Sequence, residues 1–235
     1  MTSSFIVLSK VKGLLLSFLI WAGDFMDIIT KIEQQKKNIH RYSIFLNEKY
    51  SFSVSEDTLV KLRLRKGLEI DKEQLDYILK QEEINSCKAF GIKLLSHKAR
   101  NEYEIKDKML KKGFNEETIS EAIAYLREQN YINDEEYAKS YIKDRVNIKK
   151  LGYVRIKNEL FQKRIDSDII EDTLNELIDT KDEYKRALEL AEKKMNSTYK
   201  NDDTQAVYRK LGGFLQRRGY SMDTILKVLN KVLKQ

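Results

Sequence analysis

The 235-residue chain contains no proline, only 9 glycines and a single cysteine. Without proline, and with so little glycine, few positions interrupt a helix, so an all-β or a doubly wound fold is disfavoured. One cysteine, Cys87, excludes an internal disulfide and is typical of a reducing compartment, so we expect a cytoplasmic protein. The composition therefore predicts a mainly α-helical protein.

The chain also has few residues in the spacing that catalysis or metal binding requires. Its two histidines, His40 and His97, are not spaced as metal ligands with Cys87 or with paired carboxylates. Gly212-Gly213 lacks the lysine and hydroxyl residue of a phosphate-binding glycine loop. We therefore expect no enzymatic activity, no metal, no cofactor and no small-molecule substrate.

Charged residues are abundant, at 34% of the chain, and the formal net charge is +7 with a pI near 9.1. A basic excess of this kind favours a polyanionic partner such as nucleic acid. The 37 acidic residues show that the charge is mixed rather than uniformly basic. Charge alone therefore indicates the class of partner and not a particular one.

Residues 1–25 differ in composition from the rest of the chain. Leu14–Ala22 is nearly all apolar and follows Lys10 and Lys12, as in a signal peptide, yet it is shorter than the roughly twenty residues that span a bilayer. Three interpretations are open: a signal or anchor, a peripheral amphipathic piece, or upstream sequence ahead of a true start at Met26. We favour the last, because polar sequence of globular type begins there, and mapping the N-terminus of the native protein would test it.

Residues 26–84 predict a distinct N-terminal module with strands and short helices. Three segments with β-type alternation predict a small sheet: Ile28–Glu33, Ile39–Leu46 and Tyr50–Val54. A capping serine predicts a short helix over 55–64, and an aspartate predicts another over 71–83.

The rest of the chain predicts tandem three-helix repeats, because one type of helix break recurs about every fifty residues. The equivalent breaks are Gly113-Phe114, Arg164-Ile165 and Gly219-Tyr220. Each is followed by an N-cap residue: Asn115, Asp166 and Ser221. Apolar positions coincide in the same register, for example Ile105, Ile156 and Leu211. Chance periodicity in a helical protein is the alternative, but it would not repeat the caps and breaks as well.

We place the three repeats at 85–133, 134–180 and 181–235. The first helix of the first repeat is predicted over Cys87–Ser96, separate from the helix of the N-terminal module. The apolar faces of such short helices need neighbours, so we expect the repeats to stack on one continuous core.

Basic residues gather around the breaks of the second and third repeats. Rows of guanidinium and ammonium groups can bind phosphates or acidic side chains, and the alternative is a solvated face balanced by acids. The candidate contact residues are Arg145, Lys149, Lys150, Arg155, Lys157, Lys163 and Arg164 in the second repeat and Arg209, Lys210, Arg217 and Arg218 in the third. Tyr141 and Tyr153 beside them could stack on bases, although helical aromatics more often pack in a core.

From Met26 to its end the chain resembles the RecX regulatory proteins of bacteria, in particular their Firmicute branch. The resemblance rests on Leu151-Gly152-Tyr153, Arg155-Ile156, Glu159-Leu160 and Lys163, on the runs 104–114 and 209–220, and on Leu64-Arg65-Lys66-Gly67 after the opening 29–50. The chain departs from the family pattern at residues 1–25 and at Arg164, where glycine is usual.

The resemblance implies a non-enzymatic modulator of the RecA recombinase, built as a curved array of three-helix repeats that lies in the groove of the RecA–DNA filament. It would mainly inhibit recombination and the coprotease activity of the SOS response. Its partners would be the RecA filament and DNA, contacted directly or through the filament, and we expect a monomer that is not membrane-bound.

Two other functions are compatible with the sequence. A general helical DNA-binding protein acting without RecA would bind bare DNA with a marked salt dependence. A membrane-attached adaptor depends wholly on residues 1–25, and it fails if a protein that begins at Met26 keeps its function and location.

Overall fold

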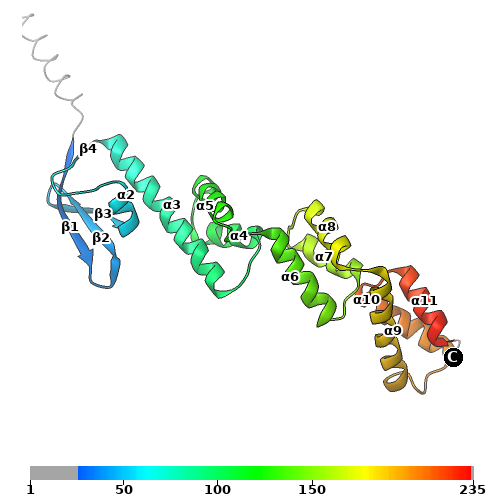
Figure 1. Ribbon diagram of the computed structural model, residues 1–235. Helices are drawn as coiled ribbons and strands as arrows, with labels where there is room; N and C mark the ends of the chain where they lie inside the picture. The colour runs from blue at the N-terminus through cyan, green and yellow to red at the C-terminus, as the bar shows by residue number, and fades with distance from the viewer. Residues whose placement is uncertain (1–25, 234–235) are drawn as a thin grey trace, which may run out of the picture. The chain divides into compact units, whose positions relative to one another are not determined.

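The computed structural model describes residues 26–233, and the predicted extension at 1–25 lies outside the described residues. By its internal contacts the chain divides into two compact units, with the boundary between Ala89 and Phe90. The strands belong to the first unit and the second unit is helical (Figure 1). The predicted fold class, mainly α-helical with a small N-terminal sheet, is confirmed.

The first unit contains a four-stranded antiparallel sheet with the order β3-β2-β1-β4. Its strands are β1 (Asp27–Gln35), β2 (Asn38–Leu46), β3 (Lys49–Ser55) and β4 (Glu69–Ile70). The three predicted strands are present. The fourth was missed because two residues, paired with Asp27 and Ile28, are too short for an alternating pattern.

Two helices follow the strands, and both differ from the sequence-based prediction. Helix α2 (Glu56–Lys61) begins at the predicted cap but ends before residue 64. Helix α3 (Lys72–His97) is one continuous helix, so the prediction of two helices here was wrong. No proline or glycine lies between 84 and 86 to interrupt it.

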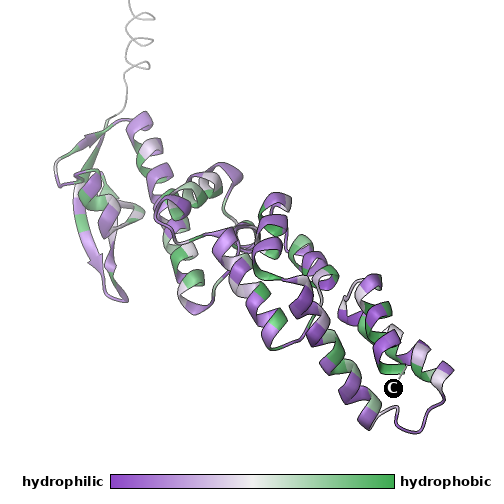
Figure 2. Cartoon of the chain, turned by 45° about the vertical axis from the view of Figure 1, so that its right-hand side comes forward, coloured by the Kyte–Doolittle hydropathy of each residue, from purple (hydrophilic) through white to green (hydrophobic). Residues whose placement is uncertain are grey.

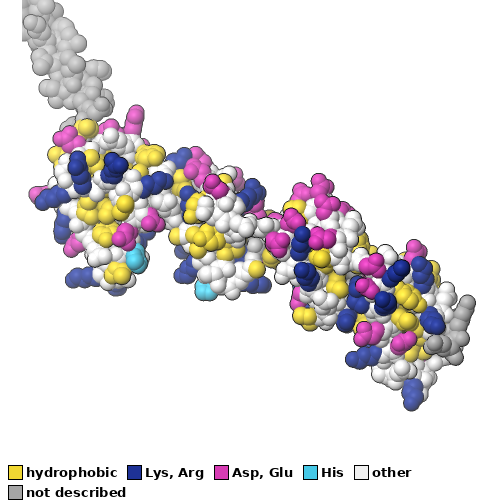
Figure 3. Space-filling view, viewed as in Figure 1, with side chains coloured by type: hydrophobic (Ala, Val, Ile, Leu, Met, Phe, Trp, Pro, Cys, Tyr) yellow, Lys and Arg dark blue, Asp and Glu magenta, His cyan; other side chains and the backbone are white. Residues whose placement is uncertain are grey.

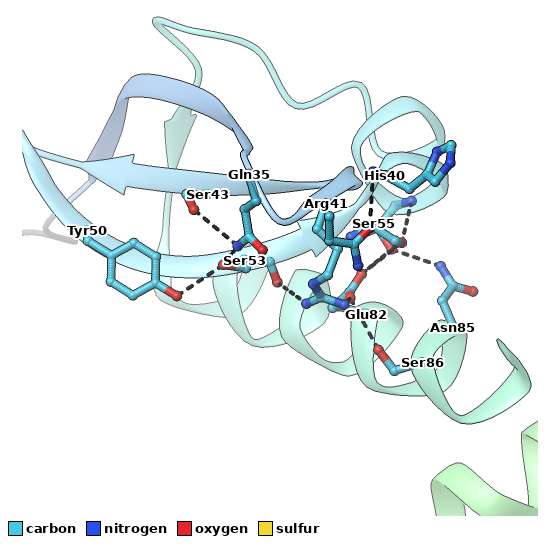
Figure 4. Close-up of polar contacts among 12 residues, drawn as sticks. Gln35, His40, Arg41, Ser43, Tyr50, Ser53, Ser55, Glu82, Asn85 and Ser86 are labelled. Atoms are coloured by element: carbon cyan, nitrogen blue, oxygen red, sulfur yellow. Dashed lines mark hydrogen bonds and ion pairs between the residues drawn. The ribbon is translucent and has the colours of Figure 1, made fainter. Parts of the chain in front are cut away.

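A buried carboxylate fastens α3 to the sheet within the first unit (Figure 4). Glu82 is only 7% exposed, and its Oε2 accepts hydrogen bonds from the Ser55 backbone N–H at 2.9 Å and the Thr58 hydroxyl at 2.7 Å. Its Oε1 lies 3.0 Å from an Arg41 terminal nitrogen and accepts from the Ser86 hydroxyl at 3.2 Å. A buried charge requires such partners, so the contacts account for Glu82 structurally.

The second unit contains three groups of three helices, and the predicted three-helix repeats are confirmed. The C-terminal part of α3 belongs with α4 and α5, since a side chain at Gly91 would meet Leu126 and Met109. The helices are α4 (Glu102–Lys112), α5 (Glu116–Glu128), α6 (Asp134–Asn147), α7 (Tyr153–Gln162), α8 (Ser167–Leu177), α9 (Thr180–Ser197), α10 (Thr204–Arg218) and α11 (Met222–Leu233).

The breaks share the backbone conformation that their alignment suggested. Gly113, Arg164 and Gly219 have φ values of 100°, 61° and 85°, all in the left-handed region. This conformation ends a helix and is easiest for glycine, so Arg164 adopts it at some cost.

Each of the second and third repeats encloses its own apolar core. Ile142 and Ile156 are fully buried in the second repeat, and Leu211 and Val228 are fully buried in a separate cluster in the third. Apolar and polar residues accordingly alternate around the helices (Figure 2). The expectation of one continuous core was wrong, because three helices suffice to cover each cluster and polar contacts join the repeats.

Candidate functional site

The predicted basic residues lie mostly at two seams of the second unit. The first seam joins repeat one to repeat two, where the start of α4 meets the end of α7. The second seam joins repeat two to repeat three, where the start of α7 meets the end of α10. Figure 3 shows basic and acidic side chains interspersed on one face of these helices.

The first seam is held by a buried asparagine and an ion pair. Asn101 is fully buried, and its Nδ2 donates to the Lys163 carbonyl at 2.6 Å, while its Oδ1 caps α4 by accepting from the Glu104 N–H at 2.9 Å. The Lys163 Nζ donates to Glu104 Oε1 at 2.7 Å, which spans the seam a second time. Lys163 is therefore a neutralised structural contact in this conformation.

Two stacked tyrosines lie beside the first seam and line, together with Lys163, a cavity of about 830 Å³. The ring centres of Tyr137 and Tyr141 lie 6.1 Å apart, and the Lys163 Nζ lies 5.4 Å from the centre of each ring. Burial lowers the pKa of Lys163, but hydrogen bonding to Glu104 and Tyr137 outweighs it and raises the pKa above its ordinary value. Lys163 thus stays charged within an aromatic and acidic surrounding.

Glu159 of α7 accepts hydrogen bonds from three side chains of the second repeat. Its Oε2 accepts from Arg145 Nε and from the Tyr141 hydroxyl, each at 2.9 Å, and its Oε1 accepts from Arg155 Nε at 3.0 Å. Burial raises the pKa of Glu159, but the donors Arg145, Arg155 and Tyr141 together hold it below its ordinary value. Arg145 is consequently engaged inside the repeat and is poorly placed to meet a partner.

The second seam depends on the close approach of two glycines. The Gly152 N–H donates to the Arg218 carbonyl at 2.9 Å, and the Val154 N–H donates to the Gly219 carbonyl at 3.0 Å. A Cβ on Gly152 would lie 2.4 Å from the Gly219 oxygen, and one on Gly219 would lie 2.2 Å from the Arg155 Cβ. Only residues without a side chain allow these backbones to meet.

Five cations collect around this second glycine contact, and we call them the second-seam cations. The terminal nitrogen NH1 of Arg155 donates to the Arg217 carbonyl at 2.8 Å, and the Arg218 guanidinium donates to the Lys149 carbonyl. The Tyr220 hydroxyl donates to the Lys150 carbonyl at 2.9 Å. The second-seam cations are Lys149, Lys150, Arg155, Arg217 and Arg218.

Carboxylates neutralise only part of this charge. Glu159 pairs with Arg155, and an exposed Glu189 lies 3.9 Å from the Lys150 Nζ. Among the described residues no ion pair engages the side chains of Lys149, Arg217 or Arg218. Buried Glu183, which accepts from the Tyr153 backbone N–H at 2.7 Å, adds a carboxylate near this seam. The uncompensated positive charge is therefore that of Lys149, Arg217 and Arg218.

The remaining predicted contact residues also divide into those that form an ion pair and those that do not. Lys157 pairs with Glu171, and Lys210 pairs with Asp202 at 2.8 Å, so an acid balances each of them. Arg164 and Arg209 are exposed, and within residues 26–233 they form no ion pair. The structure thus separates neutralised from available basic residues, which the sequence alone could not do.

Several seam residues escaped sequence reasoning. Asn101, Glu104 and Tyr137 were not predicted as contact residues, although Asn101 precedes its helix as a capping residue should. The hydroxyls of Tyr141 and Tyr153 donate to Glu159 and Glu171, each at 2.9 Å, so both side chains have partners within the protein, and their stacking on bases stays a prediction.

The histidines show no catalytic or metal-binding arrangement. His40 is exposed and its Nδ1 lies 3.1 Å from Glu56 Oε2, while His97 ends α3. Across residues 26–233, no three His, Cys, Asp or Glu side chains are grouped as ligands for a metal ion. Over the same residues, every helix is too short or too polar to traverse a lipid bilayer.

Four family models match the chain in succession. The RecX N-terminal domain matches residues 27–71, and the first, second and third RecX three-helix domains match residues 87–126, 133–174 and 181–229.

Curated proteins called regulatory protein RecX are similar over most of the chain. One from Clostridium botulinum (strain Eklund 17B / Type B) is 35% identical over 87% of this chain and 96% of its own length. Another, from Clostridium perfringens (strain SM101 / Type A), is 36% identical over 88% and 97%. One from Bacillus cereus (strain AH820) is 40% identical over 85% of this chain and 75% of its own length.

Two crystal structures also resemble this one. A regulatory protein RecX superimposes with a TM-score of 0.74 at 30% identity, covering 87% of this chain and 99% of that chain. RecX from Lactobacillus salivarius superimposes with a TM-score of 0.60 at 31% identity, covering 64% and 97%.

Proposed function

Because the chain belongs to the RecX family of regulatory proteins, we propose that it binds the RecA–DNA filament and mainly inhibits its recombinase and SOS coprotease activities. The observation that carries this proposal is the uncompensated positive charge of the second-seam cations on a helical repeat surface. A filament that contains DNA offers the complementary negative charge. Regulation would thus act through binding rather than through catalysis, in a cytoplasmic monomer.

The contact residues of this proposal are a subset of the basic residues that the sequence indicated. Lys149, Arg164, Arg209, Arg217 and Arg218 have no acidic partner among the described residues, so binding a partner would break no ion pair. Arg145, Lys157, Lys163 and Lys210 already hold carboxylates, and exchanging one partner for another yields little net free energy. We assign the first set to the filament and the second set to the fold. Arg155 and Lys150 are intermediate, because Arg155 pairs with Glu159 but keeps free N–H groups, and Lys150 lies 3.9 Å from an exposed Glu189.

The test is a RecA strand-exchange or filament ATPase assay with the wild-type protein and the variant Arg164→Glu/Arg209→Glu. Both side chains are exposed, so the variant should fold and should inhibit more weakly. The matched control is Lys36→Glu/Lys37→Glu in the turn of the N-terminal sheet, which makes the same change in net charge and should inhibit as the wild type does. Equal inhibition by all three proteins would overturn the assignment.

A general DNA-binding protein that acts without RecA is the second candidate. The second-seam cations favour it, because phosphates alone could satisfy them. Under the first proposal the protein binds assembled filaments more tightly than it binds bare DNA or RecA alone, whereas under the second it binds bare DNA as tightly as filaments. Equilibrium binding to the three targets at one salt concentration distinguishes the two.

A further inference from the structure

The two seams are built on equivalent positions of the repeat. In the register set by the breaks, Asn101 corresponds to Gly152, and Lys163 corresponds to Arg218. The side-chain amide of Asn101 donates to the Lys163 carbonyl, and the backbone N–H of Gly152 donates to the Arg218 carbonyl. One type of contact therefore joins both pairs of repeats, and the charges around it can be compared directly.

The net charge at equivalent positions differs between the two seams. At the first seam, Glu104 faces Lys163 in an ion pair whose side chains are 26% and 25% exposed. The position of Glu104 is taken at the second seam by Arg155, and that of Lys163 by Arg218, so two guanidinium groups replace an ion pair. Glu159 pairs with Arg155, whereas no acid among the described residues pairs with Arg218, so an anion bound here would lower the free energy of the seam.

The arginines at the second seam are oriented and still have donors to offer. Arg155 donates through Nε to Glu159 and through one terminal nitrogen to the Arg217 carbonyl. Arg218 donates through one terminal nitrogen to the Lys149 carbonyl, and its guanidinium lies 5.4 Å from the centre of the Phe214 ring. A guanidinium carries five N–H groups, so several remain on each arginine after these contacts. The bonds to main-chain carbonyls reduce the entropy that binding would otherwise cost.

We propose that the second seam is a binding site for the phosphate groups of a nucleic-acid backbone, and that the first seam is not. A guanidinium can donate two parallel hydrogen bonds to the oxygens of one phosphate. Nearby lysines add electrostatic attraction that does not depend on the base sequence. The carbonyls of Lys149 and Arg217 accept from the two arginines, and the side chains of Lys149 and Arg217 are exposed, so successive phosphates of one strand could be held. The site deepens the proposed function, on which it rests, by assigning one of its surfaces to DNA.

The experiment measures binding of the full-length protein, without recombinase, to a fluorescent oligonucleotide at several salt concentrations. In the variant Lys149→Glu/Arg217→Glu two cations without ion pairs are reversed, so folding should be unaffected. We expect weaker binding and a salt slope smaller in magnitude by about 1.4 for a single strand, the effect of losing roughly two phosphate contacts. The control Lys36→Glu/Lys37→Glu carries the same net charge and should keep the wild-type slope.

A complementary variant transfers the second-seam charges to the first seam. Glu104→Arg replaces the carboxylate that pairs with Lys163 by a guanidinium, at the position that Arg155 holds in the second seam, and it should strengthen binding and steepen the salt slope. Circular dichroism checks that both variants remain helical.

The possible outcomes separate this site from the proposed function. If Lys149→Glu/Arg217→Glu binds DNA with the wild-type slope, the phosphate site is wrong, whether or not recombinase inhibition persists. If DNA binding is lost while inhibition is retained, the phosphate site stands and it is the proposed role of this surface in inhibition that fails. If polyglutamate displaces the oligonucleotide at equal charge concentration, the site binds acidic protein segments and the assignment to phosphate is overturned.

Discussion

The two seams of the helical unit solve the same packing problem with opposite chemistry. At the first, a fully buried Asn101 and an ion pair between Lys163 and Glu104 make the contact with side chains. At the second, bare backbone at Gly152 and Gly219 makes the contact and leaves arginines around it. Neighbouring repeats can thus be joined by side-chain contacts or by main-chain hydrogen bonds. When main-chain hydrogen bonds join them, the charged side chains nearby remain available to bind a partner.

The largest expected effect concerns the glycine contact. Gly219→Ala combines a left-handed backbone with a Cβ placed 2.2 Å from the Arg155 Cβ, so we expect it to lower the free energy of unfolding by about 3 kcal/mol or more. Gly113→Ala is the control, since its φ is also positive but no atom lies within 4 Å of the added Cβ, and it should cost about 1 kcal/mol. Urea denaturation followed by circular dichroism compares them, and equal losses would contradict the packing of the second seam.

A smaller loss is expected at the first seam. Asn101→Ala removes both the cap of α4 and the hydrogen bond to the Lys163 carbonyl, so it should destabilise the protein by about 2 kcal/mol. Asn133→Ala removes a cap alone, because Asn133 accepts from the Glu136 N–H at the start of α6, and should cost about 1 kcal/mol. Thermal unfolding of the two variants measures the difference, and a smaller loss for Asn101→Ala would show that the side-chain bridge contributes nothing.

The ion pair of the first seam should contribute about 1 kcal/mol of coupling in a double-mutant cycle of Lys163→Gln and Glu104→Gln. The same cycle with Arg155→Gln and Arg218→Gln at the second seam should give a coupling of zero or of opposite sign, since like charges repel. Chemical denaturation at low and high salt supplies both numbers. Favourable coupling at the second seam would remove the contrast between the seams.

The smallest expected effect is a dependence of stability on pH through Glu159. The folded pKa of this carboxyl lies below its ordinary value of 4.5, because its hydrogen-bond donors outweigh burial. Its stabilising contribution is therefore fully present above pH 4.5 and is lost as the pH falls through the folded pKa. The free energy of unfolding, measured between neutral and acidic pH, should fall less steeply in Glu159→Gln than in the wild type as the pH is lowered. An equal pH dependence in the two proteins would contradict this.

Features set by neighbours along the chain could be predicted from the sequence. The caps at Asn115 and Asp166 accept from Thr118 and Asp168, only a few residues away, so a local pattern was sufficient. The separation of α3 into two helices was predicted wrongly, since residues 84–86 continue the helix.

The state of the basic residues could not be predicted in this way. Lys163 and its partner Glu104 are 59 positions apart in the sequence, and Arg155 is 62 positions from Arg217, whose carbonyl it contacts. A run of basic residues therefore looks the same in the sequence whether an acid from another repeat neutralises it or not.

The sequence by itself determined the helical class, the three repeats and the family, because helix periodicity, capping and breaks act over short distances along the chain. Only the tertiary structure decided that each repeat closes its own core and that an acid pairs with Lys163 at the first seam while none pairs with Arg218 at the second. The physical reason is that Coulombic and hydrogen-bond energies depend on distances in space, which folding sets between residues far apart in the chain.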